Sequence, residues 1–528
     1  MPEPFFITTA IDYTNGAPHI GHAYEKVLAD VVARYRRLRR EDVFFLTGVD
    51  QHGQKVQQSA ESAGIPPQEF VDAVTEKFLA LWTKLDVRYD RWAATTDLVH
   101  KECVRKILSR LNAAGQIYKA RRSGYYSVRQ EQFLTDKERG PDGGFGPEWG
   151  EVEFREEENY YFKLAEHRQW LLDLIDKRSA QGKPLVLPDF RVAELRNAVE
   201  KLEGDLCISR PKARLSWGIE FPFDPEFVTY VWFDALVNYI SFAPGYDPEA
   251  LAPDPSFSRL WHTVVHVIGK DILIPAHGVY WPVMLKALGF TDDEMPTLLV
   301  HGWWNIAGTK MSKSLGNIVD PNALADKYGA GALRYYLMSD IATGRDSDFS
   351  EERLIQQFNT DLANNLGNLL NRSLNMTAKY RGGKLTAASL DAGLIAPDGV
   401  TGALRGYREK MDGFRVNAAL ADALSIAVQC NAMIDVQKPW ALAKDPARGK
   451  DLDAVLYTLA ESLRITAILI SPVLPRAAHG IFDQLAWKPD SAGSDSRFAL
   501  DDTNWGGLPD GHVLGAPVPL FPRIDVSE

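Results

Sequence analysis

Two histidines and a glycine lie where a loop runs into a helix. Residues 18–22 read Pro-His-Ile-Gly-His, after a strand-like run at 5–10 (FFITTA) and just before a helical pattern. A helix N-terminus presents unpaired N–H groups and partial positive charge, which suit a phosphate. His19 and His22 add hydrogen-bond donors, and Gly21 lets a flat base approach the backbone closely. The segment predicts a nucleotide site, although the four-residue pattern alone is equally compatible with a surface turn.

A second segment could hold the tail of a nucleoside triphosphate. Residues 308–316 read Gly-Thr-Lys-Met-Ser-Lys-Ser-Leu-Gly and present Lys310 and Lys313 between two glycines. Glycines allow such a loop to move, and two lysines can grip phosphates and offset the charge that develops on a leaving pyrophosphate. A loop of lysine and serine is by itself usually solvated surface. The order of the two segments, about 290 positions apart, and their contexts point to nucleotide chemistry.

The elements around the first segment form a βαβ unit. The runs 5–10 and 42–49 (DVFFLTGV) are typical of buried strands, and apolar residues recur at helical spacing between them. Such a unit predicts a parallel sheet with a ligand crevice at the ends of its strands. Strand-like runs at 264–268 (VVHVI) and 297–301 (TLLVH), with a helix near 278–288 between them, would complete the sheet.

The pattern changes twice along the chain. From about 116 to 230, short strand-like pieces surround helices and glycine and proline cluster, which predicts an inserted α+β domain. From about 351 onward the pattern is almost purely helical and predicts a bundle. The predicted units are a Rossmann-type, doubly wound catalytic domain in two halves (1–115 and 231–304), the insertion (116–230), a signature-loop and stem-contact region (305–350), the helical domain (351–481) and a C-terminal tail packed on the bundle (482–528).

Composition limits the compartment and the partners. The 528 residues are 45% hydrophobic and 24% charged, as in a globular enzyme of several domains. The N-terminus is too acidic for a secretory signal and we see no run of roughly 18 apolar residues, so a cytosolic location is expected. A net charge of −11 argues against bulk attraction to nucleic acid, so any RNA contact must be local. Cys103, Cys207 and Cys430 lie far apart and form no Cys-x-x-Cys zinc motif.

Taken together, the two segments resemble the signature sequences of class I aminoacyl-tRNA synthetases, and the match runs along nearly the whole chain. Four further stretches are similar to the methionyl-tRNA synthetase family within that class: 10–16 (AIDYTNG), 47–53 (TGVDQHG), 230–235 (YVWFDA) and 268–271 (IGKD). The resemblance implies activation of L-methionine with ATP to methionyl-adenylate and its transfer to initiator and elongator tRNA(Met). ATP with Mg²⁺ is the implied cofactor.

The resemblance also assigns residues to the site. The catalytic positions are His19, Gly21, His22, Lys310 and Lys313, and the ATP-binding positions are His19, His22, Gly269, Asp271, Lys310 and Lys313. The methionine-binding positions are Ala10, Ile11, Tyr13, Asp50, Trp232, Ala235, Tyr239, His277 and Trp281. Asp50 corresponds to the group that holds the ammonium, and aromatic side chains suit a polarizable thioether, although each alone could be ordinary core. Between Asp271 and His277 the chain is one residue longer than the family pattern, which leaves the placement of His277 open.

The helical region holds a separate group of polar side chains. Asn364, Asn368 and Arg372 share one face of a helix whose other face is apolar. Amides and a guanidinium can hydrogen-bond the edges of splayed bases, and Trp440, after Pro439, offers a stacking plane. By itself such a stripe is more often solvated surface. The resemblance favours an RNA site, because Asn364, Asn368, Arg372, Pro439 and Trp440 match the positions with which methionyl enzymes read the CAU anticodon.

The implied reaction is attack of the methionine carboxylate on the α-phosphate of ATP, then attack by the terminal ribose hydroxyl of the tRNA. Positioning and charge stabilisation would do most of this chemistry: the histidines act on the phosphates, the glycine admits adenine and the lysines stabilise the pentavalent state. A synthetase for leucine, isoleucine, valine or cysteine is an alternative, disfavoured by the pocket residues and by an insertion too short for a large editing domain. A catalytically silent RNA-binding paralogue is another, disfavoured by two intact signatures.

Two expectations concern features that vary within the family. Residues 124–131 (GYYSVRQE) resemble the first half of a zinc knuckle, with Ser127 and Gln130 where a Cys-x-x-Cys pair would stand, and its second half falls at 141–146, again without cysteine. His167 is a lone histidine nearby, so no zinc is expected, and aromatic residues are expected to hold the knuckle: Tyr126, Phe133, Phe145 and Trp149. Nothing after about 485 resembles the appended tRNA-binding module of dimeric members, so a monomer is expected.

Overall fold

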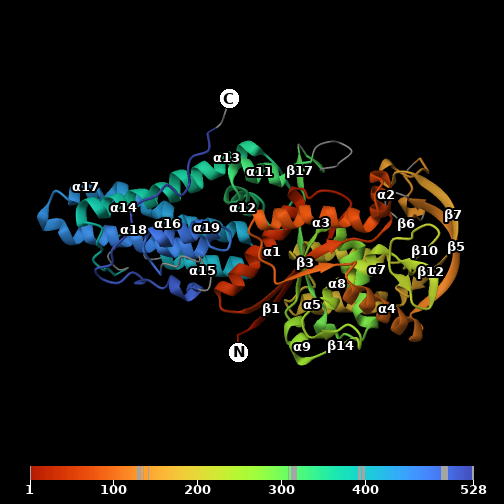
Figure 1. Cartoon of the computed structure of the whole chain (residues 1–528). Helices are drawn as coiled ribbons and strands as arrows, with labels where there is room; N and C mark the ends of the chain where they lie inside the picture. Colours follow the sequence, from red (N-terminus) through yellow and green to blue (C-terminus); the bar gives the residue numbers. More distant parts are fainter. Residues whose placement is uncertain are drawn as a thin grey trace.

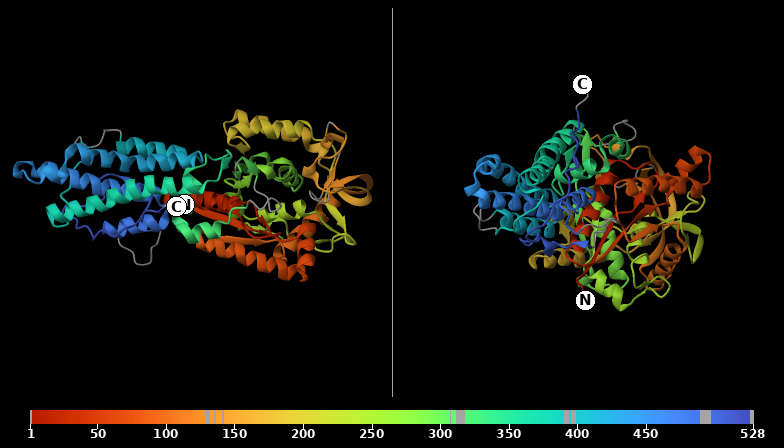
Figure 2. Two further views of the ribbon diagram at one scale, coloured as in Figure 1. Left: turned by 90° about the horizontal axis from the view of Figure 1, so that it is seen from above. Right: turned by 60° about the vertical axis from the view of Figure 1, so that its left-hand side comes forward.

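The computed structural model is elongated: a catalytic unit built on a parallel sheet joins a helical bundle that extends away from it (Figure 1). The structure describes residues 2–127, 132–134, 136–140, 142–306, 308–310, 318–389, 394, 399–488 and 497–525. Seen from above, the long helices of the bundle run side by side and point away from the sheet (Figure 2). This is the predicted arrangement of an α/β domain, an insertion and a helical domain.

The central sheet has β1 in its middle. Within the described residues the strand order is β2-β3-β1-β15-β16-β8, with β4 beside β3, and every pairing is parallel. Because β1 lies between β3 and β15, the two halves of the catalytic domain meet at one strand and leave a crevice at its C-terminal end. The bounds are β1 Pro4–Thr9, β2 Asp12–Tyr13, β3 Asp42–Asp50, β4 Arg91–Ala94, β8 Val186–Leu187, β15 Val265–Gly269 and β16 Thr297–His301.

Alternate residues of these strands enter two different cores. Phe5 and Ile7 of β1 pack into one core with helix α1 (Ile20–Leu38), whereas Phe6 packs into the other with α4 (Leu98–Ala113). Successive side chains of a strand point to opposite faces, and a parallel sheet is covered on both. The strands therefore read as continuous apolar runs, which is the pattern that predicted them.

The insertion contributes a strand to the central sheet. β8 lies inside the range 116–230 and pairs with Leu298 and Leu299 of β16. A strand of two residues is too short to leave a pattern in the sequence. The rest of the insertion is antiparallel, with sheet orders β6-β5-β7-β9 and β10-β12-β11 and helices α5 and α6. Its strands are β5 Ile117–Ser127, β6 Gln132–Leu134, β7 Val152–Phe162, β9 Leu206–Cys207, β10 Ser209–Pro211, β11 Glu220–Phe221 and β12 Asp224–Thr229, and its helices are α5 Arg168–Ala180 and α6 Val192–Glu200.

A short hairpin and two helices connect the sheet to the bundle. The strands β17 (Trp304–Ile306) and β18 (Thr309–Lys310) form the hairpin, and β19 (Ser347–Asp348) pairs with β17. Helices α11 (Pro321–Tyr328) and α12 (Ala330–Ser339) follow. The second signature segment begins in this hairpin, and its residues 311–317 lie outside the described part of the chain.

The bundle is built from amphipathic helices around one apolar core. Phe358, Leu362 and Leu366 are buried in it, as the sequence pattern predicted. The helices are α13 Glu351–Gln357, a π-helical segment Phe358–Gly367, α14 Asn368–Arg381, α15 Gly399–Asp412, α16 Val416–Gln437, α17 Pro439–Leu442, α18 Gly449–Ile470 and α19 Pro475–Gln484.

Helix α16 is the most apolar of the long helices in the described part of the chain. It alone there is long and apolar enough to cross a membrane, with a mean hydropathy of 1.3, and half of that window is buried inside the protein. It packs against α15 and α18 in the bundle. Core packing is sufficient to explain its composition.

The C-terminal residues 497–525 lie on the bundle. Glu461 and Arg464 of α18 form a fully buried ion pair, and the Glu461 carboxylate also accepts hydrogen bonds from the N–H groups of Gly506, Gly507 and Leu508. Buried charges are stable only when they are paired and hydrogen-bonded. The tail therefore completes the core of the bundle.

Candidate functional site

A cavity of about 850 Å³ opens at the C-terminal ends of β1, β3, β15 and β16. Parallel sheets place their ligand sites at this edge, where the strand order reverses. Both halves of the catalytic domain contribute to its lining. The predicted residues that line it are Ala10, Ile11, Tyr13, His19, Gly21, His22, Asp50, Trp232, Ala235, Tyr239, Gly269, Asp271 and His277.

One predicted residue of the methionine site does not line the cavity. Trp281 is fully buried behind Tyr239, with 5.7 Å between ring centroids, and its indole N–H donates to His266 Nε2 at 3.1 Å. Trp281 therefore supports the wall of the cavity. Lys310 belongs to β18, and Lys313 lies outside the described residues.

His19 and His22 form the N-terminal cap of α1. His19 Nδ1 accepts from the N–H of Gly21 at 3.1 Å, and His22 Nδ1 accepts from the N–H of His19 at 3.0 Å. The rings stack with 3.8 Å between centroids, and a Cβ at position 21 would lie 2.9 Å from the His19 ring, which explains the glycine. Because both Nδ1 atoms accept, the neutral rings carry their protons on Nε2, as phosphate donors require.

The opposite side of the cavity is an aromatic wall. His277 Nδ1 donates to the carbonyl of Ile272 at 3.0 Å, so its Nε2 accepts from the hydroxyl of Tyr239 at 2.8 Å. Burial lowers the pKa of His277 to about 4, which keeps the ring neutral. The ring of Tyr239 stacks on the buried His266 at 4.0 Å. His277 lies in the segment Leu273–Tyr280, whose helical path is interrupted by the extended backbone of Ile274 (φ −116°, ψ 127°).

Asp50 is the last residue of β3 and lies beside the short strand β2. Tyr13 of β2 pairs in register with Asp50. The backbone N–H and the hydroxyl of Thr14 both donate to the Asp50 carbonyl, at 3.0 and 2.9 Å. The backbone of Asp50 is thereby held at the rim, as a recognition carboxylate requires.

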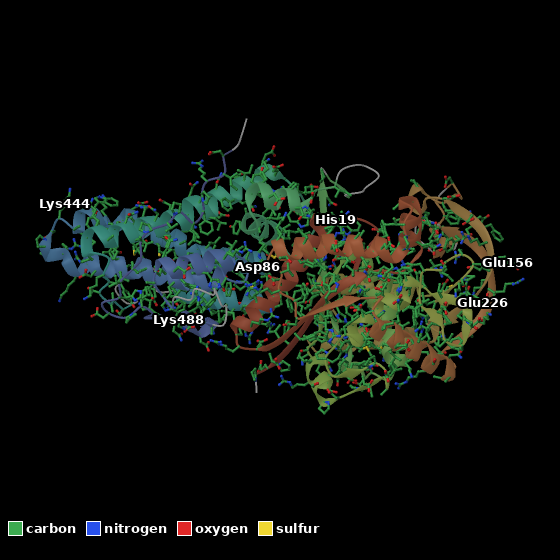
Figure 3. The ribbon with its side chains drawn as sticks, viewed as in Figure 1. His19, Asp86, Glu156, Glu226, Lys444 and Lys488 are labelled. Atoms are coloured by element: carbon green, nitrogen blue, oxygen red, sulfur yellow. The ribbon has the colours of Figure 1, made fainter. Side chains whose placement is uncertain are left out.

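The second predicted site extends along the bundle toward its tip, from Asn364, before α14, to Trp440 in α17. Asn364 and Asn368 are exposed, and the half-buried Arg372 lies 3.5 Å from Asp435. Trp440 of α17 is 43% exposed, whereas the neighbouring Pro439 is buried. Figure 1 shows α17 at the tip, and Figure 3 shows Lys444, just beyond α17, far from His19. Polar and aromatic side chains on such a tip suit an unpaired RNA loop.

Comparison with known proteins identifies the family. Residues 5–142 and 149–374 match the family model "tRNA synthetases class I (M)", and residues 384–528 match the "Anticodon binding domain of methionyl tRNA ligase". The chain belongs to the methionyl-tRNA synthetase family. Matches to methionine–tRNA ligases along its full length also establish the activity of a class I methionine–tRNA ligase. The alternative amino acids and the silent paralogue are therefore set aside.

The relatives cover 98–100% of the chain. It is 39% identical to the methionine–tRNA ligase of Lactococcus lactis, over 100% of this chain and 78% of the relative, and 41% identical to that of Deinococcus radiodurans, over 98% and 74%. Among solved structures, Mycobacterium tuberculosis methionyl-tRNA synthetase in complex with methionyl-adenylate superposes with a TM-score of 0.89 at 37% identity, covering 99% of this chain and 100% of that one. The predicted family and fold class are confirmed.

The knuckle of this family member is held by side chains other than cysteine. Ser127 donates from its hydroxyl to the carbonyl of Trp149 at 2.5 Å, Tyr126 is buried, and Tyr125 packs against Phe145. Gln130 lies outside the described residues. The described residues contain no group of three or more His, Cys, Asp or Glu that could hold a metal. A hydroxyl engaged in this way does not fit a structural zinc site.

Sequence reasoning missed a buried charged cluster beneath the cavity. Lys26 of α1 is fully buried, and its ammonium lies 2.5 Å from Asp12 Oδ1, 2.8 Å from Glu25 Oε1 and 2.9 Å from the carbonyl of Ala10. Glu25 Oε2 lies 3.0 Å from His301 Nε2. The signal for this cluster was the Glu25-Lys26 pair, on the helix that begins in the first signature segment. Other lining residues that the sequence did not single out include Lys55, Arg191, Glu194, Asn238, Trp303 and Trp304.

The cluster holds two carboxylates for one ammonium. Burial raises the pKa of Asp12 to about 7, because the attraction of Lys26 offsets burial only in part and Glu25 adds repulsion. Burial also acts on Glu25, but Lys26 and His301 together lower its pKa. Glu25 is therefore the ionised partner of Lys26 throughout the neutral range.

Proposed function

We propose that the 850 Å³ cavity is where methionine and ATP react, with Asp50 accepting the ammonium of methionine and the wall of Trp232, Ala235 and Tyr239 enclosing its thioether. The observation that carries the proposal is the convergence of these residues, from both halves of the catalytic domain, on one cavity with the His19–His22 cap. A relative of 37% identity has been solved with methionyl-adenylate, which supports it.

The wall has the chemistry that methionine requires. The hydroxyl of Tyr239 donates to His277, so the lone pairs of its oxygen remain beside an otherwise apolar surface. Such a wall shapes the site for an unbranched thioether and gains from sulfur–aromatic contact. Discrimination against an amino acid shorter by one methylene is worth about 1–3 kcal/mol.

Catalysis follows from positioning and charge. The Nε2–H groups of His19 and His22 and the N-terminus of α1 bind the phosphates, which Mg²⁺ accompanies as the counter-ion. The methionine carboxylate attacks the α-phosphate in line, pyrophosphate leaves, and Lys310 and Lys313 stabilise the charge that develops on it. Gly269 and Asp271, at the end of β15, contact the nucleotide.

The tip of the bundle reads the anticodon in this proposal. Asn364, Asn368 and Arg372 hydrogen-bond the bases of tRNA(Met), and the exposed ring of Trp440 stacks on one of them. The match of 384–528 to an anticodon-binding family supports it.

The protein acts as a monomer in the cytosol, needs Mg²⁺ with ATP and holds no zinc. Light scattering of the purified protein tests the oligomeric state.

The decisive experiment is ATP–pyrophosphate exchange with each of the twenty amino acids. Methionine alone should support rapid exchange, with at most weak activity from close analogues. Exchange that is faster with leucine or cysteine than with methionine would contradict the assigned wall. Charging of tRNA(Met) transcripts with the anticodon CAU against a changed anticodon then tests the tip of the bundle.

A further inference from the structure

We propose that Asp234 is a positioning residue: through two buried histidines it holds the loop that carries Asp50 at a fixed distance from the wall of the methionine site. The inference rests on the function proposed for the cavity. It concerns two family-like stretches, 47–53 and 230–235, whose central His52 and Asp234 have no role in the chemistry described above.

The contacts form one continuous chain. Asp234 Oδ2 lies 2.7 Å from His52 Nδ1, and its Oδ1 lies 2.7 Å from His100 Nε2. His100 Nδ1 in turn lies 2.8 Å from the hydroxyl of Ser241. All four side chains are buried, and none of them lines the cavity. We call Asp234, His52, His100 and Ser241 the Asp234 clamp.

The protonation states of the clamp follow from its partners. A carboxylate only accepts, so both histidines donate to it, and Nδ1 of His100 faces the hydroxyl of Ser241. Burial alone would raise the pKa of Asp234, but the imidazoles of His52 and His100 hold it at about 2. The carboxylate is therefore ionised throughout the neutral range.

The clamp joins the elements that carry the methionine site. His52 follows the end of β3, Asp234 belongs to helix α7 (Val231–Leu236) and Ser241 to α8 (Asn238–Ser241), while His100 anchors them to α4. Four of the proposed methionine contacts therefore lie within two residues of a clamp member. The pairs are Asp50 with His52, Trp232 and Ala235 with Asp234, and Tyr239 with Ser241.

Methionine depends on this spacing because it touches both sides at once. Its ammonium binds the loop of Asp50 while its thioether binds the wall. Displacement of one contact group by about 1 Å can cost about a hundredfold in such a site. A ligand without the ammonium does not contact the loop of Asp50, so it does not sense the distance between this loop and the wall. This difference separates positioning from a general loss of structure.

The test uses Asp234→Asn, which keeps the size of the side chain. An amide presents one acceptor and one donor, so it cannot accept from both histidines. The KM for methionine in exchange should rise about tenfold or more, with kcat within about threefold and the KM for ATP within about twofold. Binding of a methionyl sulfamoyl-adenosine should weaken by the same factor. The same compound without its α-amino group should bind within about twofold of wild type.

Three further variants test for misfolding and general destabilisation. Asn can place its side-chain N–H where the Nδ1–H of histidine stands, so His52→Asn should retain methionine affinity and His52→Ala should lose it. Glu461→Gln makes the same carboxylate-to-amide change at an equally buried site in the bundle, and should leave the KM for methionine unchanged. If Asp234→Asn does not fold, the comparison of His52→Asn with His52→Ala tests the proposal.

Three results would overturn the inference: an unchanged KM for methionine, equal weakening of both sulfamoyl compounds, or loss in His52→Asn as large as in His52→Ala. Failure of the underlying function is distinguishable, because the wild-type enzyme would then show no methionine-dependent exchange at all. Retention in His52→Asn with selective loss of the ammonium-bearing compound would establish the positioning role.

Discussion

Replacing Lys26 with methionine should destabilise the catalytic unit by about 3–5 kcal/mol at pH 8. The ammonium of Lys26 is fully buried and lies between Asp12 and Glu25, at 2.5 and 2.8 Å. Methionine fills a similar volume, so the change removes charge and hydrogen bonds and leaves little empty space. Breaking a buried ion pair from one side strands the partner charge in a low dielectric, and here two carboxylates are stranded.

The loss of stability caused by Lys26→Met should become smaller as the pH falls. In the wild-type protein burial opposes ionisation of Glu25, but Lys26 and His301 lower its pKa. Without Lys26 the burial effect dominates and raises that pKa above its value of about 4.3 in the unfolded chain. The folded variant then binds more protons than the unfolded chain between those pKa values, so its stability rises on acidification. We expect the deficit at pH 5.5 to be at least about 1 kcal/mol smaller than at pH 8, because a tenfold change in proton affinity is worth about 1.4 kcal/mol.

Urea unfolding followed by tryptophan fluorescence measures the stability deficit of Lys26→Met at pH 8 and at pH 5.5. The relevant transition is the one that an adenylate analogue moves to higher urea, because only the catalytic unit binds it. Lys84→Met is the matched control: its partner is Asp326, the side chains are 34% and 69% exposed, and the loss should stay below about 1 kcal/mol. A Lys26→Met deficit below about 1 kcal/mol at pH 8, or one that grows toward pH 5.5, would refute the reasoning.

Four other outcomes are expected. Lys313→Ala should lower kcat for exchange more than about tenfold with little change in methionine binding, and a loss within about threefold would contradict its role. Tyr239→Phe leaves the buried acceptor of His277 unpaired, so the free energy of unfolding of the catalytic unit should fall by about 1–3 kcal/mol; an unchanged free energy would show that another donor replaces the hydroxyl. Trp440→Ala should raise the KM for tRNA about 5- to 150-fold, because stacking on a base is worth about 1–3 kcal/mol. Exchange and stability should not change, because the ring is 43% exposed, and equal losses in charging and exchange would mean that it packs the bundle. Tag-free protein should contain no stoichiometric zinc and should recover full exchange after EDTA once Mg²⁺ is restored, whereas recovery only with zinc would overturn the expectation.

The local pattern of the sequence was sufficient for the main strands and for the bundle core. The runs 5–10, 42–49 and 297–301 match β1, β3 and β16 within one residue at each end, because a strand covered on both faces must be apolar throughout. The helical periodicity of the bundle likewise predicted which leucines are buried. The two signatures predicted the class of reaction, since their chemistry depends on residues that are adjacent in the chain.

Tertiary structure decided what the sequence left open. Trp281 supports the wall from behind, and β8 joins the central sheet although it lies within the insertion. Likewise, Asp234 meets His52 across 182 positions. A local pattern records only whether a side chain faces a core. Which buried charge meets which partner depends on the order of the strands and on the long connections between them, so only the folded chain determines it.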